Sequence, residues 1–302
     1  MRGIALKVVS VCIFVVMAAL LKATGSMPAG QLVFFRALFA IVPVVLYLSW
    51  QRQLAAGIRT ANLRGHVWRG LIGVLSMGLG FYALTKLPLP ESIAIGYASP
   101  LLIVVFSALL LKERVHFYRW SAVLIGLAGV AIMLWPRLTV FSSQTPLGHE
   151  ETIGAIAALG GAVAAAFAMM QVRKLVQTER TETIVLYFFI SASVISLATV
   201  PFGWVWPNPQ QALFLVLAGF AGGIAQILMT ASYRHADMSV IAPFEYTSLL
   251  LGLLVGYFAF GDVPTIPMLI GAAIVIASGI FVILREHRLG LDRIKAREAN
   301  TP

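Results

Sequence analysis

The 302 residues are 60% hydrophobic and only 11% charged, with a mean hydropathy of +0.91. Soluble globular domains carry about 25% charged residues because their surface is solvated, so this composition excludes a water-soluble protein. Lys and Arg outnumber Asp and Glu by 22 to 12, which gives a net charge of +10. We attribute this excess to the cytoplasmic loops of a membrane protein rather than to nucleic-acid binding.

A spanning helix needs about 20 apolar residues, and the chain divides repeatedly into runs of that length. Lys7 interrupts the first run and no clear A-x-A site precedes Lys22, so we expect a retained span rather than a cleaved signal peptide. Proline-containing turns at 87–90 and 261–264 separate some of the runs. The sequence predicts an all-α integral membrane protein with ten transmembrane helices, at 3–21, 29–49, 68–86, 90–111, 118–135, 152–172, 183–203, 210–232, 238–259 and 264–284.

Orientation follows from the distribution of lysine and arginine. With the N-terminus in the cytoplasm, 18 of the 22 basic residues fall in cytoplasmic segments, as the positive-inside rule requires. The exceptions are Lys22, Lys86 and Arg137 on the outside and Arg36 within a span. An odd number of spans would mix the two sides, so the asymmetry favours an even number with both termini in the cytoplasm.

Internal similarity indicates two halves. Residues 83–115 align with 232–264, which places the tetrad 96–99 on 245–248. Five spans in each half would invert the second copy relative to the first, as is typical of secondary transporters. The predicted organisation is a five-helix repeat at 1–136, an outer linker at 137–151, an inverted five-helix repeat at 152–285 and a basic cytoplasmic tail at 286–302.

Short motifs along nearly the whole chain resemble the bacterial EamA-type branch of the drug/metabolite transporter superfamily. The first half carries Pro28, Phe34-Phe35-Arg36-Ala37, Tyr82-Ala83-Leu84, Ser99-Pro100, Leu111-Lys112-Glu113, Arg119-Trp120, Gly126 and Gly129. A weaker second copy comprises Ala231-Ser232-Tyr233, Pro243, Gly261-Asp262 and the interval from Gly271 to Gly279. Within this superfamily the chain is most similar to the YddG-type amino-acid exporters.

The resemblance implies two inverted halves around a central cavity, in the bacterial cytoplasmic (inner) membrane. It also implies an alternating-access secondary transporter that exports neutral or aromatic amino acids, with proton coupling and facilitated diffusion both open. An importer or facilitator of riboflavin, a nucleoside derivative or S-adenosylmethionine is the alternative within this class, and a membrane sensor or intramembrane enzyme the alternative outside it. Because the sequence has no metal-ligand, nucleophile or phosphate-loop pattern, we expect no enzyme activity, cofactor or metal. We expect a monomer or weak homodimer.

Two charged residues fall inside predicted spans, where ionisable groups are costly and normally face a protein interior or an aqueous cavity. Arg36 is a candidate anchor for a substrate carboxylate; alternatively it snorkels to the outer interface or bonds the carbonyl end of a neighbouring helix. Glu245 is a candidate site for a substrate amine or a coupled proton; alternatively it is protonated, or hydrogen-bonded to a neighbouring helix.

The repeat-equivalent tyrosines Tyr97 and Tyr246 enter their spans from opposite faces of the membrane, each followed by a serine, Ser99 or Ser248. Since transporter sites lie near the midplane between repeats, we expect these four to line the cavity, although packing and interhelical hydrogen bonds would also use them. Weaker candidates for substrate binding are Tyr82, Gln226, Met77 and Met170, and the candidate hinges are Pro100 and Pro243. Glycine pairs at 219/223 and 252/256 predict close helix contacts.

Overall fold

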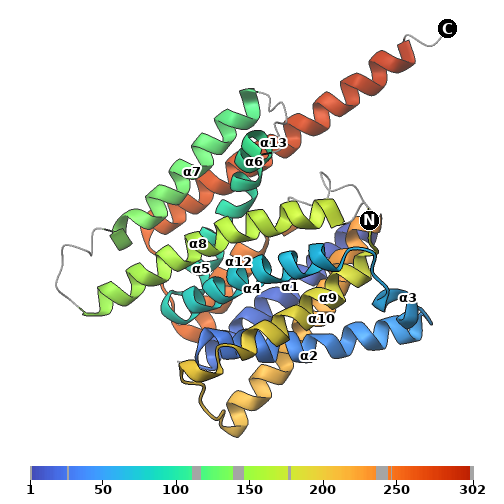
Figure 1. Cartoon of the computed structure of the whole chain (residues 1–302). Coiled ribbons are helices and arrows are strands. Elements are labelled where there is room, and N and C mark those ends of the chain that lie inside the picture. The colour runs from blue at the N-terminus through green and yellow to red at the C-terminus, as the bar shows by residue number, and fades with distance from the viewer. Residues whose placement is uncertain are drawn as a thin grey trace.

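The structure is a computed structural model that describes residues 2–25, 27–110, 117–138, 146–175, 178–235, 244–245 and 247–299. These residues are largely helical and contain no strand. Figure 1 shows the helices as one elongated bundle, with α13 projecting beyond it toward the C-terminus. The helices are α1 (Arg2–Ala23), α2 (Ala29–Trp50), α3 (Leu54–Ile58), α4 (Leu63–Lys86), α5 (Leu89–Gly96), α6 (Ala98–Leu110), α7 (Phe117–Leu138), α8 (Pro146–Leu175), α9 (Thr181–Leu197), α10 (Pro209–His235), α12 (Thr247–Val255) and α13 (Ile266–Ala299).

The predicted all-α membrane fold is confirmed. Seven segments of the described residues are long and apolar enough to cross a membrane, namely Gly3–Ala23, Ala29–Trp50, Leu63–Lys86, Leu89–Phe106, Phe117–Pro136, His149–Val172 and Pro209–Met229. Three shorter apolar helical segments, Thr181–Leu197, Thr247–Phe260 and Ile266–Val282, occupy the remaining predicted positions. The last of these continues as helix to Ala299, so part of the predicted tail is also helical.

Helix ends follow local sequence signals. The side chain of Asn62 accepts a hydrogen bond from the amide of Gly65 (2.9 Å), which starts α4 several residues before the predicted position. Asn208 and Gln211 exchange side-chain-to-amide hydrogen bonds at the start of α10, as in a capping box. α9 ends at Leu197 rather than at 203, because Pro201 has no N–H for the carbonyl of Leu197 and its ring clashes with that carbonyl.

The helices pair symmetrically between the two halves of the chain. α1 packs on α10 and, equivalently, α8 packs on α4; α2 contacts both α9 and α10, as α9 contacts both α2 and α4. The fifth helices of the two halves, α7 and α13, also pack on each other and run side by side in Figure 1. Exchanging the halves therefore reproduces these contacts between described helices, as expected for two related repeats.

Two close contacts between spans depend on the glycine pairs at 219/223 and 252/256 that the sequence singled out. A Cβ built on Gly219 would lie 2.3 Å from Phe39 Cβ, and one on Gly223 would lie 2.3 Å from Pro43 Cγ, so α10 approaches α2 through bare backbone. Gly252 and Gly256 face the fourth span in the same way, at Ile93 and Pro90 respectively. The predicted role of these glycines in close packing is confirmed.

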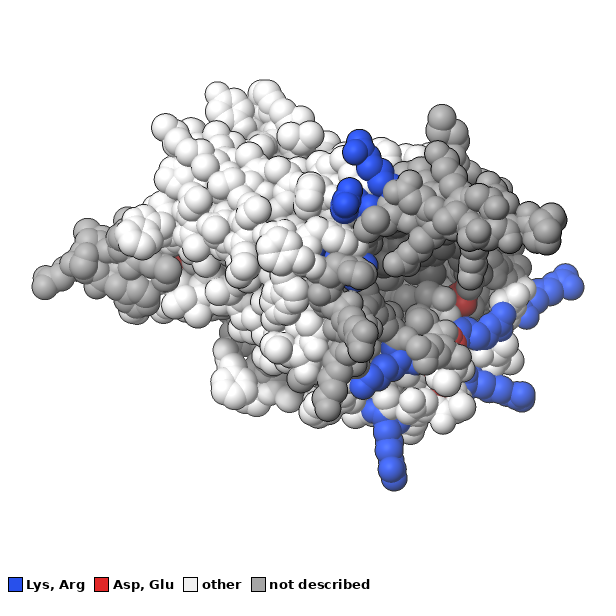
Figure 2. All heavy atoms as spheres, turned by 90° about the horizontal axis from the view of Figure 1, so that it is seen from above, with Lys and Arg blue, Asp and Glu red and all other residues white. Residues whose placement is uncertain are grey.

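The surface is apolar over the body of the bundle and basic at one end. Leu124, Val194 and Phe258 are 64%, 63% and 80% exposed, which suits contact with lipid. Figure 2 shows Lys and Arg side chains gathered toward the right-hand end, where α3 and the N-terminus lie in Figure 1. The exposed basic side chains of the described residues include Arg52, Arg59, Arg64, Lys174, Arg180, Arg285 and Arg288.

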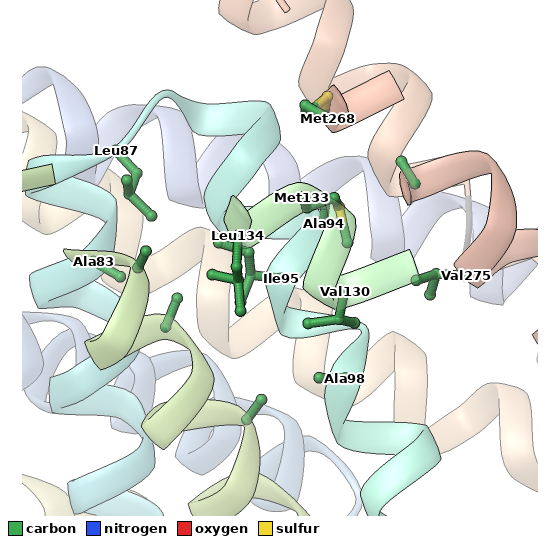
Figure 3. Close-up of a cluster of buried hydrophobic side chains, with 14 of the residues drawn as sticks. Ala83, Leu87, Ala94, Ile95, Ala98, Val130, Met133, Leu134, Met268 and Val275 are labelled. Carbon is green, nitrogen blue, oxygen red and sulfur yellow. The ribbon is translucent and has the colours of Figure 1, made fainter. Parts of the chain in front are cut away.

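The largest buried apolar cluster joins both halves beside the junction of α5 and α6, which together form the fourth span. Figure 3 shows Ala94, Ile95 and Ala98 of that span among side chains of α7 and α13. Val130 and Met133 come from α7, whereas Met268 and Val275 come from α13. Tyr82 and Tyr97 pack against the same cluster, so the core supports the candidate site described next.

Candidate functional site

The fourth span is interrupted at Tyr97. α5 ends at Gly96 and α6 begins at Ala98, while the amide of Tyr97 donates to the carbonyl of Ala94 (3.1 Å) in a tighter turn. Pro100 explains the interruption, because it has no N–H for the carbonyl of Gly96 and its ring clashes with that carbonyl. Pro100 thus interrupts the helix as a hinge residue would. Pro243, the candidate hinge of the second half, lies outside the described residues.

Tyr97 connects the two halves at this interruption. Its hydroxyl donates to the backbone carbonyl of Glu245 (2.7 Å) and is hydrogen-bonded to the hydroxyl of Ser248. Ser248 in turn donates to the same carbonyl of Glu245 (2.8 Å). The sequence-predicted residues Tyr97, Glu245 and Ser248 therefore meet; Tyr246, the repeat partner of Tyr97, lies outside the described residues.

Glu245 also forms an ion pair with Lys7 of α1. Lys7 Nζ lies 2.5 Å from Glu245 Oε1, and the side chain of Lys7 is 1% exposed whereas that of Glu245 is 39% exposed. Sequence reasoning missed Lys7 because the charge count assigned it to the cytoplasmic end of the first span. Its position within the 3–21 run was the available signal, since a lysine inside a span needs a partner or an aqueous surrounding.

This group, which we call the Lys7 cluster (Lys7, Tyr97, Glu245 and Ser248), combines complementary chemistry. It offers an ammonium, a partly exposed carboxylate, a phenol and a hydroxyl from three different spans. A buried cation and an adjacent anion form a strong charge-assisted contact, and the same two groups can bind a ligand that carries both charges. The cluster is therefore suited to a dipolar polar ligand.

Arg36 lies in a second group, in the first half of α2. Its side chain is 5% exposed, its Nε faces Met17 Sδ (3.5 Å), its Nη1 faces Met77 Sδ (3.2 Å), and its guanidinium lies 5.0 Å from the centre of the Phe189 ring. The alternative that Arg36 snorkels to the interface is wrong, because the side chain is enclosed by α1, α4 and α9. No carbonyl of the described residues accepts from it either.

The two groups contact α1 at positions that are well separated along its axis. Both groups have a residue on α1: Lys7 belongs to the first group, and Met17 contacts Arg36 in the second. These two residues lie ten positions apart. At 1.5 Å per residue this separation is about 15 Å. This rise along α1 is larger than the few ångströms that separate the two charged groups of an α-amino acid.

The remaining predicted residues join neither group through a hydrogen bond between described residues. Tyr82 lies beneath the ammonium of Lys86, whose Nζ is 6.0 Å from the ring centre. Met170 is buried on α8, and Ser99 and Gln226 are partly buried. Gln226 follows Ala225, whose carbonyl accepts from Ser10 one turn beyond Lys7 (2.8 Å), so it lies at the level of the Lys7 cluster.

Each end of the bundle carries a polar contact between the halves. At one end, Lys22 Nζ lies 3.8 Å from Asp262 Oδ2, and the same carboxylate oxygen accepts from the amide of Leu89 (2.9 Å) at the start of α5. Lys22, which the charge count places on the outside, therefore pairs with a carboxylate of the second half. At the other end, Glu179 accepts from Thr60 Oγ1 (2.6 Å) and from the amides of Ala61 (2.8 Å) and Asn62 (3.0 Å).

The ionisation of Glu179 follows from these contacts. Burial alone raises the pKa of the Glu179 carboxyl, but the hydrogen bonds from Thr60, Ala61 and Asn62 and the neighbouring His66 together hold it below its ordinary value. Hydrogen bonds favour the charged form because an ionised carboxylate is the stronger acceptor. Among the described residues, no three His, Cys, Asp or Glu side chains come together as metal ligands would.

Comparisons with known proteins agree with this arrangement. The model of the EamA-like transporter family matches residues 1–135 and again residues 152–285. A crystal structure whose chain is 22% identical superposes with a TM-score of 0.66, covering 95% of this chain and 98% of the other. That likeness concerns the fold.

Several relatives are named as transporters. The riboflavin transporter of Vibrio cholerae is 29% identical over 85% of this chain and 83% of its own. The S-adenosylmethionine uptake transporter of Rickettsia prowazekii is 25% identical over 85% and 84%, and the pseudopaline exporter CntI of Pseudomonas aeruginosa is 28% identical over 93% of each chain. The two matched segments and these relatives identify the chain as a multi-pass membrane transporter, not an enzyme, that belongs to the EamA-like transporter family.

Proposed function

We propose that this transporter exports neutral amino acids, aromatic ones included, by alternating access, and that the Lys7 cluster binds the substrate. The observation that carries the proposal is the Lys7–Glu245 ion pair (2.5 Å) beside an interruption in a spanning helix. An amino acid carries a carboxylate and an ammonium a few ångströms apart. It can therefore enter between Lys7 and Glu245 and replace their mutual contact with two equivalent ones.

Tyr97 supplies the second part of the argument. Its ring offers an apolar face for an aromatic or aliphatic substrate side chain, while its hydroxyl ties the fourth span to Glu245 and Ser248. Transporter binding sites typically lie near the membrane midplane at discontinuous helices between repeats. A ligand that separates Lys7 from Glu245 would loosen α1 from the ninth span, which links binding to a movement of one half against the other.

A larger amino-acid derivative is the second candidate cargo. Arg36 is a buried cation about 15 Å from the Lys7 cluster along α1, so a substrate with widely spaced charged groups would contact both. The relatives named for S-adenosylmethionine and pseudopaline suit this candidate better than a simple amino acid does. Proton coupling through Glu245 is compatible with either candidate, because its carboxylate is partly exposed and a ligand that binds Lys7 would release it from the ion pair.

The proposed setting is the bacterial cytoplasmic membrane with both termini in the cytoplasm. Its support is the exposed basic residues, which gather at the end that holds the N-terminus and α3 (Figures 1 and 2). Cytoplasmic loops are enriched in Lys and Arg. Accessibility labelling of single cysteines placed at exposed Arg59 and at exposed Trp206, in a variant whose native Cys12 is replaced, tests this orientation. Labelling of position 59 from outside intact cells would reverse it.

Transport measurements decide between the cargoes. Purified protein in liposomes is offered labelled amino acids, riboflavin and S-adenosylmethionine, with and without a pH gradient. We expect saturable movement of neutral amino acids that Lys7→Gln and Glu245→Gln each reduce. Movement of only S-adenosylmethionine or another extended substrate would select the second candidate, and movement of riboflavin alone would contradict both. Efflux from preloaded cells compared with a deletion strain then gives the direction.

A further inference from the structure

Arg36 is the most enclosed cation among the described residues that has no acidic partner. Its side chain extends from α2 and contacts three other helices: Met17 lies on α1, Met77 on α4 and Phe189 on α9. α10 approaches as well, since a Cβ built on Gly222 would lie 3.1 Å from Arg36 Nε. The side chain retains 5% of its exposure.

The hydrogen-bonding capacity of this guanidinium is far from filled. Arginine has five N–H donors and no acceptor. Within the described part of the chain, Nε and Nη1 find only the sulfur atoms of Met17 and Met77, at 3.5 and 3.2 Å, and Nη2 finds no acceptor. Thioether sulfur is a weak acceptor, and no carboxylate of the described residues lies within ion-pair distance of the guanidinium.

Such an environment favours a bound counter-ion. A charge transferred from water into an apolar interior is strongly destabilised unless it is paired and hydrogen-bonded. Arginine keeps its proton, so it cannot relieve this cost by becoming neutral as a lysine or a carboxylate can. The Phe189 ring compensates part of the charge, but it leaves the donors of Nη2 unused. The guanidinium fork is well matched to a small anion with one or two acceptor atoms.

We propose that Arg36 holds a small monovalent anion beside the first half of α2, either an inorganic ion such as chloride or a carboxylate of the transported molecule. The two sources share the same chemistry, an acceptor that fills the donors of Nη1 and Nη2. The carboxylate source rests on the second candidate cargo of the proposed function, an amino-acid derivative with widely spaced charged groups, whereas the inorganic source does not. Gly222 keeps the guanidinium uncrowded on the side of α10.

The wild-type protein tests the proposal without any substitution. Thermal unfolding in detergent is followed by tryptophan fluorescence at constant ionic strength, while the bulky sulfonate MES is replaced stepwise by chloride or by acetate. Anything that binds only the folded state raises the unfolding temperature with a saturable dependence on its concentration. We expect such a rise of several degrees with chloride, with acetate, or with both. A response that is absent or linear for both anions would overturn the proposal.

Variants then locate the site. Arg36→Gln should abolish the saturable rise in unfolding temperature. Arg36→Lys retains the charge but loses the planar fork of donors, so the anion concentration at half-saturation should increase roughly tenfold. Arg64→Gln removes a charge from an exposed position on α4 and should leave the rise unchanged. If Arg36→Gln does not fold, Gly222→Ala serves instead, since its methyl group crowds Arg36 Nε. An unchanged rise in the folded variant would refute the assignment to Arg36.

The anion that raises the unfolding temperature identifies the source of the group bound by Arg36. Saturation by chloride indicates an inorganic ion, and competition between chloride and an extended transported substrate would show a shared site. Saturation by acetate but not chloride indicates a substrate carboxylate, in which case the methyl ester of the extended substrate should bind wild type and Arg36→Gln equally. Because these titrations need no transport, failure of all amino acids in the liposome assay would remove the proposed cargo and leave the anion site standing.

Discussion

Lys7 Nζ and Glu245 Oε1 lie 2.5 Å apart although 238 residues separate them along the chain. The contact joins the first span of one half to the ninth span in the other, and Tyr97 joins the fourth span to the same point. A single position therefore connects three spans that come from both halves. Any ligand that competes for Lys7 or Glu245 acts on all three at once.

Removing one member of this pair should impair transport more than exchanging the two charges. Lys7→Gln and Glu245→Gln each leave an uncompensated charge, and we expect losses of roughly 30-fold in substrate affinity, equivalent to about 2 kcal/mol. The double substitution Lys7→Glu with Glu245→Lys should recover part of that loss. Substrate binding and uptake in liposomes measure both effects.

The matched control is a second Lys–Glu pair. Lys86 Nζ lies 2.6 Å from Glu150 Oε2, but the two side chains are 27% and 63% exposed. Exposed pairs contribute only about 0–1 kcal/mol, so Lys86→Gln should bind and transport almost as wild type does. Equal losses at Lys7 and Lys86 would show that the pair near Tyr97 has no special role.

Tyr97→Phe separates the hydroxyl from the ring. The substitution removes the hydrogen bonds to Glu245 and Ser248 while keeping the aromatic surface, and a lost hydrogen bond costs about 0.5–1.5 kcal/mol. We expect a small fall in unfolding temperature and a clear loss of transport. Ser248→Ala should be non-additive with it, because both act on one network; strictly additive effects in the double variant would argue against that network.

Pro100→Ala should make the helix of the fourth span continuous. The new N–H can bond to the carbonyl of Gly96, and removal of a helix-interior proline is worth about 3 kcal/mol. We expect a higher unfolding temperature together with slower transport, the combination that a hinge predicts. Transport at the wild-type rate in the stabilised variant would show that the interruption is not needed for movement.

Two glycine substitutions with opposite expected signs test the packing. Gly223→Ala places a methyl group 2.3 Å from Pro43 Cγ and 2.8 Å from the carbonyl oxygen of Ala40, and such overpacking costs about 1–3 kcal/mol. Gly78→Ala lies in open space on α4 and should stabilise by up to about 1 kcal/mol through helix propensity. Unfolding temperatures of the two variants give the comparison, and equal shifts would contradict the close contact of α10 with α2.

Acid should weaken the contact between the 60–62 segment and Glu179. The pKa of this carboxyl is lowered in the folded protein, so its contribution is present above the ordinary value of 4.5 and is lost as the pH falls through the folded value. Glu179→Gln keeps the acceptor oxygen but loses the charge, costing about 1 kcal/mol at neutral pH. The difference in unfolding temperature between wild type and variant should shrink below pH 4.5; a constant difference would exclude the charge as its cause.

Part of the candidate site was accessible from the sequence through the internal repeat. The alignment of 96–99 with 245–248 singled out Tyr97, Glu245 and Ser248, and the structure brings these three into contact. Ser99 was chosen by the same alignment but makes no hydrogen bond within the described residues. The interruption at residue 97 changes the direction of the side chains that follow it, and a sequence alignment does not encode that change.

The sequence by itself determined the class, the spans and their division into two halves. Transfer of apolar residues from water to lipid is a local and nearly additive quantity, so runs of about 20 residues can be counted one after another. Only the tertiary structure decided that Lys7 meets Glu245 and that Arg36 is enclosed by two methionines and Phe189. Those contacts depend on how distant helices pack, and the residues that make them are hundreds of positions apart or on separate spans.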